Sequence, residues 1–222
     1  MPELAVDSVY KFVDTVYMAE ALQQEPLDER LVGVTLGLLA DEGIERLSLR
    51  RIARRAGVSH GAPLRHYRSL SHLLAEVAAR GFRLLSAAIE RASAAVPGGA
   101  SSRVRLAVAG RAYVEAAVAN PGLFALMFRP DAVDVSNPCF ERESARAFDH
   151  LLRRVRAAQE EGWHPSRDPR VLAGCVWAGV HGLATLWAQG ALLGPVPNVS
   201  LDEMISTTLE LVISSSDGGN HE

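Results

Sequence analysis

Arginine, serine and histidine side chains are concentrated in residues 45–74, ERLSLRRIARRAGVSHGAPLRHYRSLSHLL. Residues 45–91 hold 10 Arg against 3 Glu, a charge of +7, whereas the whole chain carries −3 and its remainder −10. Guanidinium groups bind phosphate oxygens, and short polar or imidazole side chains can reach base edges. A localised basic segment on an acidic chain therefore indicates contact with nucleic acid. The alternative is a solvated helix face.

Two short helices joined by a tight turn are expected to carry these side chains. Ser48 is a good N-cap, and Leu49, Ile52, Ala53 and Ala56 recur at helical spacing. Gly57 can take the left-handed conformation that ends a helix, and Ser59 can cap a second helix over His60–His66. A helix, a glycine-containing turn and a second helix form a helix-turn-helix motif, whose second helix enters the major groove of DNA.

With these features the sequence resembles the DNA-binding domain of TetR-family transcriptional regulators. The matching positions, in order, are residues 31–43, Leu47, Ser48, Ile52, Ala53, Ala56, Gly57, Val58, Ser59, Gly61, His66, Tyr67, Ser69, Leu73 and Leu74. The resemblance implies an all-α fold, with an N-terminal three-helix helix-turn-helix domain followed by a helical ligand-binding and dimerisation domain. Helical periodicity along the chain, with no alternating strand pattern, predicts the same fold class.

The residue types assign expected roles at the DNA surface. His60 is the best candidate for a base edge, and Gly61 and Ala62 allow close approach to the groove. Arg65 and His66 can reach phosphates. The full set of expected DNA contacts is Ser48, Arg50, Arg54, Ser59, His60, Gly61, Ala62, Arg65 and His66.

Three further positions next to this set bear on the strength of DNA binding. Tyr67 is expected in the domain core in preference to a DNA contact. The family usually has a tyrosine where Leu64 stands and a lysine where Leu70 stands, and both commonly contact phosphates. The absence of these two side chains predicts weaker non-specific binding and a shallower salt dependence.

The family resemblance also implies a homodimer that reads a palindromic operator in double-stranded DNA. In the family the last two helices form a four-helix interface, and here these are residues 168–189 and 201–213. The small residues Ala173, Gly174, Ala178 and Gly182 would allow close packing there. The alternative is that they pack within the subunit.

The C-terminal half resembles a subgroup of TetR-family ligand domains that carry Trp, three residues, then His-Gly, here Trp177 and His181-Gly182. Helical spacing puts Trp177 and His181 on one face, and aromatic residues could close an apolar cavity around them. The expected ligand-binding residues are Phe82, Tyr113, Phe124, Met127, Phe128, Phe148, Trp177 and His181. The alternative is a plain aromatic core with His181 bonded to a neighbour.

Changes in composition and the positions of loop-forming residues divide the chain into four parts. Residues 1–26 form an N-terminal extension, as an extra helix or a frayed tail, and residues 27–74 form the helix-turn-helix domain. Residues 75–213 form the effector-binding and dimerisation domain, with breaks at Pro97-Gly98-Gly99 and in the Gly- and Pro-rich residues 190–199. Residues 214–222, SSSDGGNHE, are expected to be a disordered tail.

The sequence indicates no enzyme, because it shows no HExxH, GxSxG or Gly-rich phosphate loop after a strand. No cofactor or metal is expected, since Cys139 and Cys175 have no metal-ligand spacing. Without a visible signal peptide or membrane span, a cytoplasmic location and no membrane partner are expected. The predicted function is a transcriptional regulator, a repressor, released from its operator by a small apolar or aromatic effector. The alternative is a TetR-like ligand-binding protein with weakened or lost DNA binding.

Overall fold

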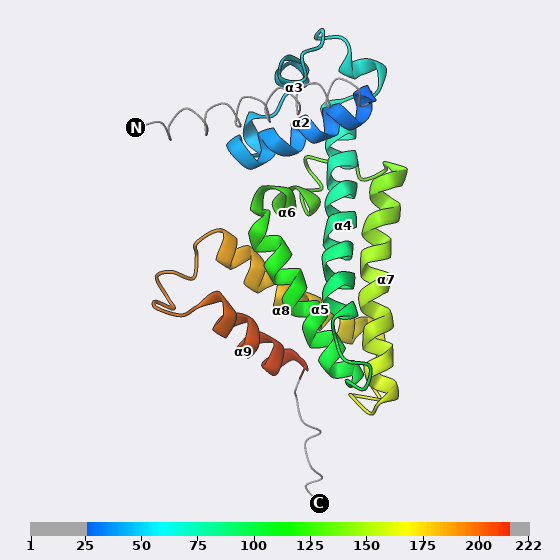
Figure 1. Cartoon of the computed structure of the whole chain (residues 1–222), viewed down its shortest axis with the longest axis vertical. Helices are drawn as coiled ribbons and strands as arrows, with labels where there is room; N and C mark the ends of the chain where they lie inside the picture. Colours follow the sequence, from blue (N-terminus) through cyan, green and yellow to red (C-terminus); the bar gives the residue numbers. More distant parts are fainter. Residues whose placement is uncertain (1–25, 214–222) are drawn as a thin grey trace, which may run out of the picture. The chain divides into compact units, whose positions relative to one another are not determined.

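The computed structural model describes residues 26–213. The expectations for the N-terminal extension and the C-terminal tail therefore lie outside the described residues, apart from Pro26. Within 26–213 the chain forms eight α-helices and two short 3-10 helices and no strand, so the all-α prediction is confirmed. The chain divides into two compact units after Leu73, and α4 (Leu70–Ala94) contributes to both (Figure 1).

The first unit contains α2 (Leu27–Glu42), the 3-10 turn η1 (Ile44–Arg46) and α3 (Leu49–Arg55). α2 ends as predicted at Gly43, whose φ of +77° places it in the left-handed region that favours glycine. Leu31 and Ile52 are fully buried in its core. α2 and α3 pack together, which fixes the face of α3 that remains exposed.

The second helix of the motif differs from the prediction. A helix over His60–His66 is wrong: the structure has only the 3-10 turn η2 (Pro63–Arg65). An α-helix here would need the N–H of residue 63 to bond the Ser59 carbonyl, and proline has no N–H. The Ala62 N–H takes that carbonyl instead at 3.0 Å, and the chain tightens into a 3-10 turn.

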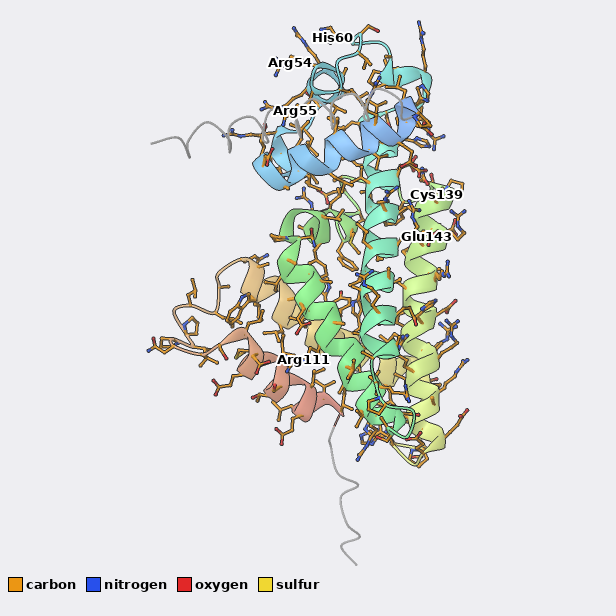
Figure 2. The ribbon with its side chains drawn as sticks, viewed as in Figure 1. Arg54, Arg55, His60, Arg111, Cys139 and Glu143 are labelled. Atoms are coloured by element: carbon orange, nitrogen blue, oxygen red, sulfur yellow. The ribbon has the colours of Figure 1, made fainter. Side chains whose placement is uncertain are left out.

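The second unit is built from the rest of α4 and five further helices. These are α5 (Ser102–Ala119), α6 (Pro121–Met127), α7 (Pro138–Glu160), α8 (Pro169–Ala188) and α9 (Leu201–Ile213). α8 packs against α5, α7 and α9, and α9 also packs against α5. Where α5 meets α9, Arg111 of α5 donates to Asp202 and Ser206 of α9 at 2.5 and 2.9 Å (Figure 2).

α4 and α7 lie side by side and run in the same direction (Figure 1). At the middle of α4 and the N-terminal end of α7, the rings of Phe82 and Phe140 have centroids 5.9 Å apart. Near their C-terminal ends Arg154 donates to Glu90 at 2.9 Å. The two helices are therefore joined by an aromatic contact and, further along, by an ion pair.

α8 is long and apolar enough to cross a membrane, by length and composition alone. Here its buried face includes Ala173, Val176, Val180 and Leu183, which pack on neighbouring helices. The buried share of its most apolar segment is 28%, so most of that segment is exposed or half-buried in the single chain.

Candidate DNA-binding surface and effector cavity

α3 presents arginines along an exposed edge of the first unit. The helix is capped as predicted, because the Ser48 hydroxyl accepts the Arg51 N–H at 3.3 Å. Arg50 and Arg54, one turn apart, are exposed and form no ion pair within residues 26–213. Arg51 instead pairs with Glu42 of α2 at 2.5 Å. Figure 2 shows Arg54 and His60 at the edge formed by α3 and the following loop, away from α2.

The turn after α3 exposes the expected base-reading residues. Gly57 has a φ of +69°, which explains the glycine at this position. Ser59, His60 and Gly61 are exposed, and Ala62 is half-buried. These side chains are accessible, but they lie on a turn, where an α-helix was expected.

η2 holds the remaining expected phosphate contacts. Pro63 is buried, whereas Arg65 and His66 are exposed. Tyr67 is 6% exposed and its hydroxyl donates to the Asp28 carbonyl at 3.2 Å, so its expected core position is confirmed. This bond ties the end of the motif to the first turn of α2.

Leu64 and Arg55 depart from the expected pattern of this surface. Leu64 is 56% exposed, so an apolar side chain stands among the polar ones where the family usually has tyrosine. Arg55 is also exposed and carries no ion pair within the described residues, and sequence reasoning did not single it out. Its signal was the RR doublet that ends α3.

The second unit contains a partly open cavity of about 500 Å³. Side chains of α4, α5, α6, α7 and α8 and the adjoining Phe128 line it, and most are apolar. The wall is formed by Phe82, Leu85, Ser86, Ile89, Leu106, Ala109, Gly110, Tyr113, Met127, Phe128, Phe140, Glu141, Ser144, Ala145, Ala147, Phe148, His150, Leu151, Arg154, Val176, Trp177 and Val180. A largely apolar cavity of this size with a few polar groups has the form of a small-ligand site.

The structure brings most of the expected ligand-binding residues to this wall. They are Phe82, Tyr113, Met127, Phe128, Phe148 and Trp177. Phe124 and His181 are not on the wall but behind it: Phe124 is 5% exposed, and its ring lies 5.7 Å from that of Tyr113 and 5.1 Å from that of His181.

Three polar side-chain atoms meet where Tyr113 and Trp177, on the cavity wall, contact His181 behind it. The Tyr113 hydroxyl lies 2.9 Å from Nδ1 of His181, and Trp177 Nε1 donates to the Tyr113 oxygen at 3.1 Å. Because indole nitrogen only donates, the phenol proton is available for His181, which then accepts through an unprotonated Nδ1. Burial raises the pKa of Tyr113 and lowers the pKa of His181, so both groups are held neutral.

Sequence reasoning missed a charged cluster at the C-terminal end of α4 and α7. Arg154 donates to Glu90 at 2.9 Å, to Ser93 Oγ at 3.3 Å and to the His150 carbonyl at 3.2 Å. His150 Nδ1 also lies 3.0 Å from the same Glu90 oxygen. The bond from Arg154 lowers the pKa of Glu90. Arg154 and His150 line the cavity, so its wall changes from aromatic to cationic along α7.

Small and apolar residues also lie exposed on α8. Ala173 is fully buried, so it packs within the subunit and the expectation that it lies on the dimer face is wrong. Gly174 and Gly182 are half-buried, with nothing within 4 Å of a Cβ built on either, and Ala178 is exposed. Val171 of α8 and Leu211 of α9 are 62% and 75% exposed.

Comparison with known proteins gives matches over both units. Residues 31–77 match the family described as bacterial regulatory proteins, tetR family, and residues 106–210 match the tetracyclin repressor-like C-terminal domain. A search of curated proteins finds no match.

Several solved structures resemble the chain. A protein of unknown function from Rhodococcus sp. RHA1 is 32% identical, with 86% of this chain and 95% of that chain covered and a TM-score of 0.74. PfmR, a TetR-family regulator from Thermus thermophilus, is 19% identical over 83% and 97% of the two chains, with a TM-score of 0.61. FadR from Bacillus subtilis, solved with stearoyl-CoA, is 16% identical over 84% and 97%, with a TM-score of 0.59. With its two family domains and its all-helical fold, the chain belongs to the TetR family of transcriptional regulators.

Proposed function

We propose that the protein is a cytoplasmic, ligand-responsive repressor that binds a palindromic operator as a homodimer and is released by a small apolar effector. One observation carries the proposal: a helix-turn-helix unit with exposed arginines and a ligand-sized cavity occur in the same TetR-family chain. The first feature suits DNA phosphates and the second suits an effector.

The proposed DNA contacts divide by chemistry. Arg50, Arg54 and Arg65 supply charge to phosphates, assisted by Ser48 and His66, whereas His60 reads a base edge. Ser59, Gly61 and Ala62 are short enough to let the turn approach the groove. A single reading element this short covers few base pairs, so two copies related by a two-fold axis are needed for a specific site.

The proposed dimer interface uses α8 and α9. The exposed residues Val171, Cys175, Ala178 and Leu186 fall on one side of α8, and Leu211 lies exposed on α9. Exposed apolar side chains at helical spacing are typical of an interaction surface. In the proposed dimer they are covered by the same face of a second copy, and an isologous contact of this kind closes at two subunits.

The proposed effector occupies the cavity of the second unit. Its aromatic wall favours an apolar or aromatic ligand. FadR from Bacillus subtilis, which has a similar fold, was solved in complex with stearoyl-CoA, and this supports a ligand with an apolar chain. To release DNA, the effector must bind the DNA-incompetent state more tightly, because equal affinity for both states shifts nothing. Phe82, Tyr113, Met127, Phe128, Phe148 and Trp177 are the proposed contacts, with Phe124 and His181 supporting the wall from behind.

A second candidate function is a TetR-like ligand-binding protein with weakened or lost DNA binding. The observation that favours it is the exposed Leu64, together with Leu70 at the other position where the family has a phosphate contact. The exposed arginines of α3, Arg50, Arg54 and Arg55, favour the first candidate.

A mobility-shift assay with the DNA that flanks the protein's own gene separates the two candidates. Retention of that duplex at low salt, over an unrelated duplex of equal length, supports the repressor. Ligands found by thermal shift are then added to the complex, and those that stabilise the protein should lower its DNA affinity. Stabilising ligands that leave DNA affinity unchanged would overturn the switching mechanism while leaving DNA binding intact.

A further inference from the structure

We propose that the effector is an elongated amphipathic acid whose carboxylate binds Arg154 and whose apolar chain lies along α7 between the aromatic rings. The inference rests on the proposed function only in placing the effector in this cavity. It adds the chemical class of the ligand and its orientation.

The residues of α7 that line the cavity extend over most of the helix. Phe140, Ser144, Phe148, Leu151 and Arg154 all line the cavity, at spacings that keep one side of the helix facing it. From Phe140 to Arg154 the helix advances about 21 Å, at 1.5 Å per residue. A ligand that contacts both ends is therefore extended.

The middle of the wall offers little polar recognition. The hydroxyl of Tyr113 and the indole N–H of Trp177 are bonded to each other, and the phenol also meets His181. The Ser144 hydroxyl donates to the Phe140 carbonyl at 2.8 Å. These groups are already satisfied, so the central wall presents mainly carbon to a ligand.

Arg154 is the partly buried cation on the wall. Its side chain is 18% exposed, whereas its partner Glu90 is 53% exposed and does not line the cavity. Glu141, the carboxylate on the wall, is exposed and lies near the aromatic end. Arg154 is therefore the charged group that the wall itself presents at the C-terminal end of α7, while Glu90, which is bonded to it, is not among the lining residues.

Arg154 has donors left for a ligand. A guanidinium has five N–H groups, and the bonds to the His150 carbonyl, Glu90 and Ser93 use three of them. The remaining two, one of them on Nε, have no partner within the described residues. A half-exposed ion pair is worth little, so a ligand carboxylate can join Arg154 or displace Glu90 at small cost.

The closing experiment titrates the full-length protein with decanoate, dodecanoate and tetradecanoate and with the methyl ester of each, by calorimetry. Each added methylene that is buried should raise affinity about fourfold. Each acid should bind roughly ten- to a hundredfold more tightly than its ester, the range expected for a hydrogen bond to a charged group.

Arg154→Met should abolish the preference for acid over ester, and Glu90→Gln should preserve or increase it. Dodecanoyl-CoA serves as a further ligand, because a thioester has no free carboxylate.

Equal affinity of acid and ester for the wild-type protein would overturn the proposal, and that comparison needs no variant to fold. Tighter binding of the thioester than of the acid, or no binding of any member of the series, would overturn it as well. None of these results touches the proposed function, whose failure would appear as absent DNA binding.

Discussion

The hydroxyl oxygen of Tyr113 on α5 lies 2.9 Å from Nδ1 of His181 on α8. Trp177 completes the arrangement by donating to the same oxygen at 3.1 Å. Tyr113 and Trp177 line the cavity and His181 lies behind it. The three rings therefore couple the packing of α5 on α8 to the shape of the cavity wall.

Tyr113→Phe should destabilise the protein by about 1–3 kcal/mol, because it leaves the indole N–H of Trp177 and Nδ1 of His181 without their shared partner. Chemical denaturation of the variant measures the loss. Trp177→Phe and the double variant complete a cycle that isolates the coupling between the two rings. If the loss of unfolding free energy in the double variant equalled the sum of the two single losses, the rings would not be coupled.

The buried His181 makes stability depend on pH. Burial lowers its pKa below the ordinary value of 6.5. The unfolded chain therefore binds more protons than the folded one in the window just below pH 6.5, so stability falls as pH is lowered through that window. Replacing His181 by Gln should flatten this part of the unfolding profile, and His60→Gln, at an exposed position, serves as the control. Parallel profiles for wild type and His181→Gln would contradict the assignment.

Gly57 and Gly61 form a matched pair that separates folding from DNA contact. A methyl group added at either glycine would meet no other atom within 4 Å, but Gly57 has a φ of +69°. Gly57→Ala should therefore cost about 1–2 kcal/mol through backbone conformation alone. Gly61→Ala should leave thermal stability nearly unchanged and weaken operator binding, since the methyl group obstructs approach to the groove. An unchanged melting temperature for Gly57→Ala would contradict the turn geometry.

The arginines of the first unit should differ from His60 in their effect on DNA binding. Replacing Arg50, Arg54 or Arg65 by Ala should weaken all duplexes alike and reduce the salt slope by about 0.9 for each phosphate that is no longer neutralised. His60→Ala should instead alter the preference among sequences. Fluorescence anisotropy over a salt series measures both effects, with Arg156→Ala on α7 as a control. Identical behaviour of the two classes would show that the proposed roles are misassigned.

The exposed face of α8 should control assembly. Ala178→Glu places a charge on that face and should convert a dimer into monomers without loss of helix content, because Ala178 is exposed in the single chain. Sedimentation velocity and circular dichroism measure the two properties. The control is Arg146→Glu, an equally exposed site on α7. A dimer that survives Ala178→Glu would place the interface elsewhere.

The sequence predicted helix boundaries well where a single capping or turn residue determines them. Helical periodicity together with Gly43 predicts α2 over residues 27–42, and Ser48 and Gly57 define the start of α3 and the turn after it. The second helix of the motif failed because a proline inside a short segment removes the one N–H that an α-turn there requires. The position of Pro63 contained this information, but a first-turn proline is usually tolerated.

The cavity could be predicted only in part. Two side chains four positions apart on a helix point in directions that differ by about 40°. The spacing of Trp177 and His181 alone therefore could not show that Trp177 faces the cavity and that His181 packs behind it. The cluster of Glu90, His150 and Arg154 joins positions some 60 residues apart. Such pairing depends on how α4 and α7 align, and periodicity within either helix does not contain it.

The most direct test of the proposed regulator is hydroxyl-radical footprinting of the full-length protein on the DNA upstream of its own gene. Two protected half-sites related by a two-fold axis, one helical turn of DNA or a multiple apart, are the predicted result. The protection should disappear with Arg50→Ala combined with Arg54→Ala. No protection at low salt, or a single protected segment without symmetry, would contradict operator binding by a symmetric dimer.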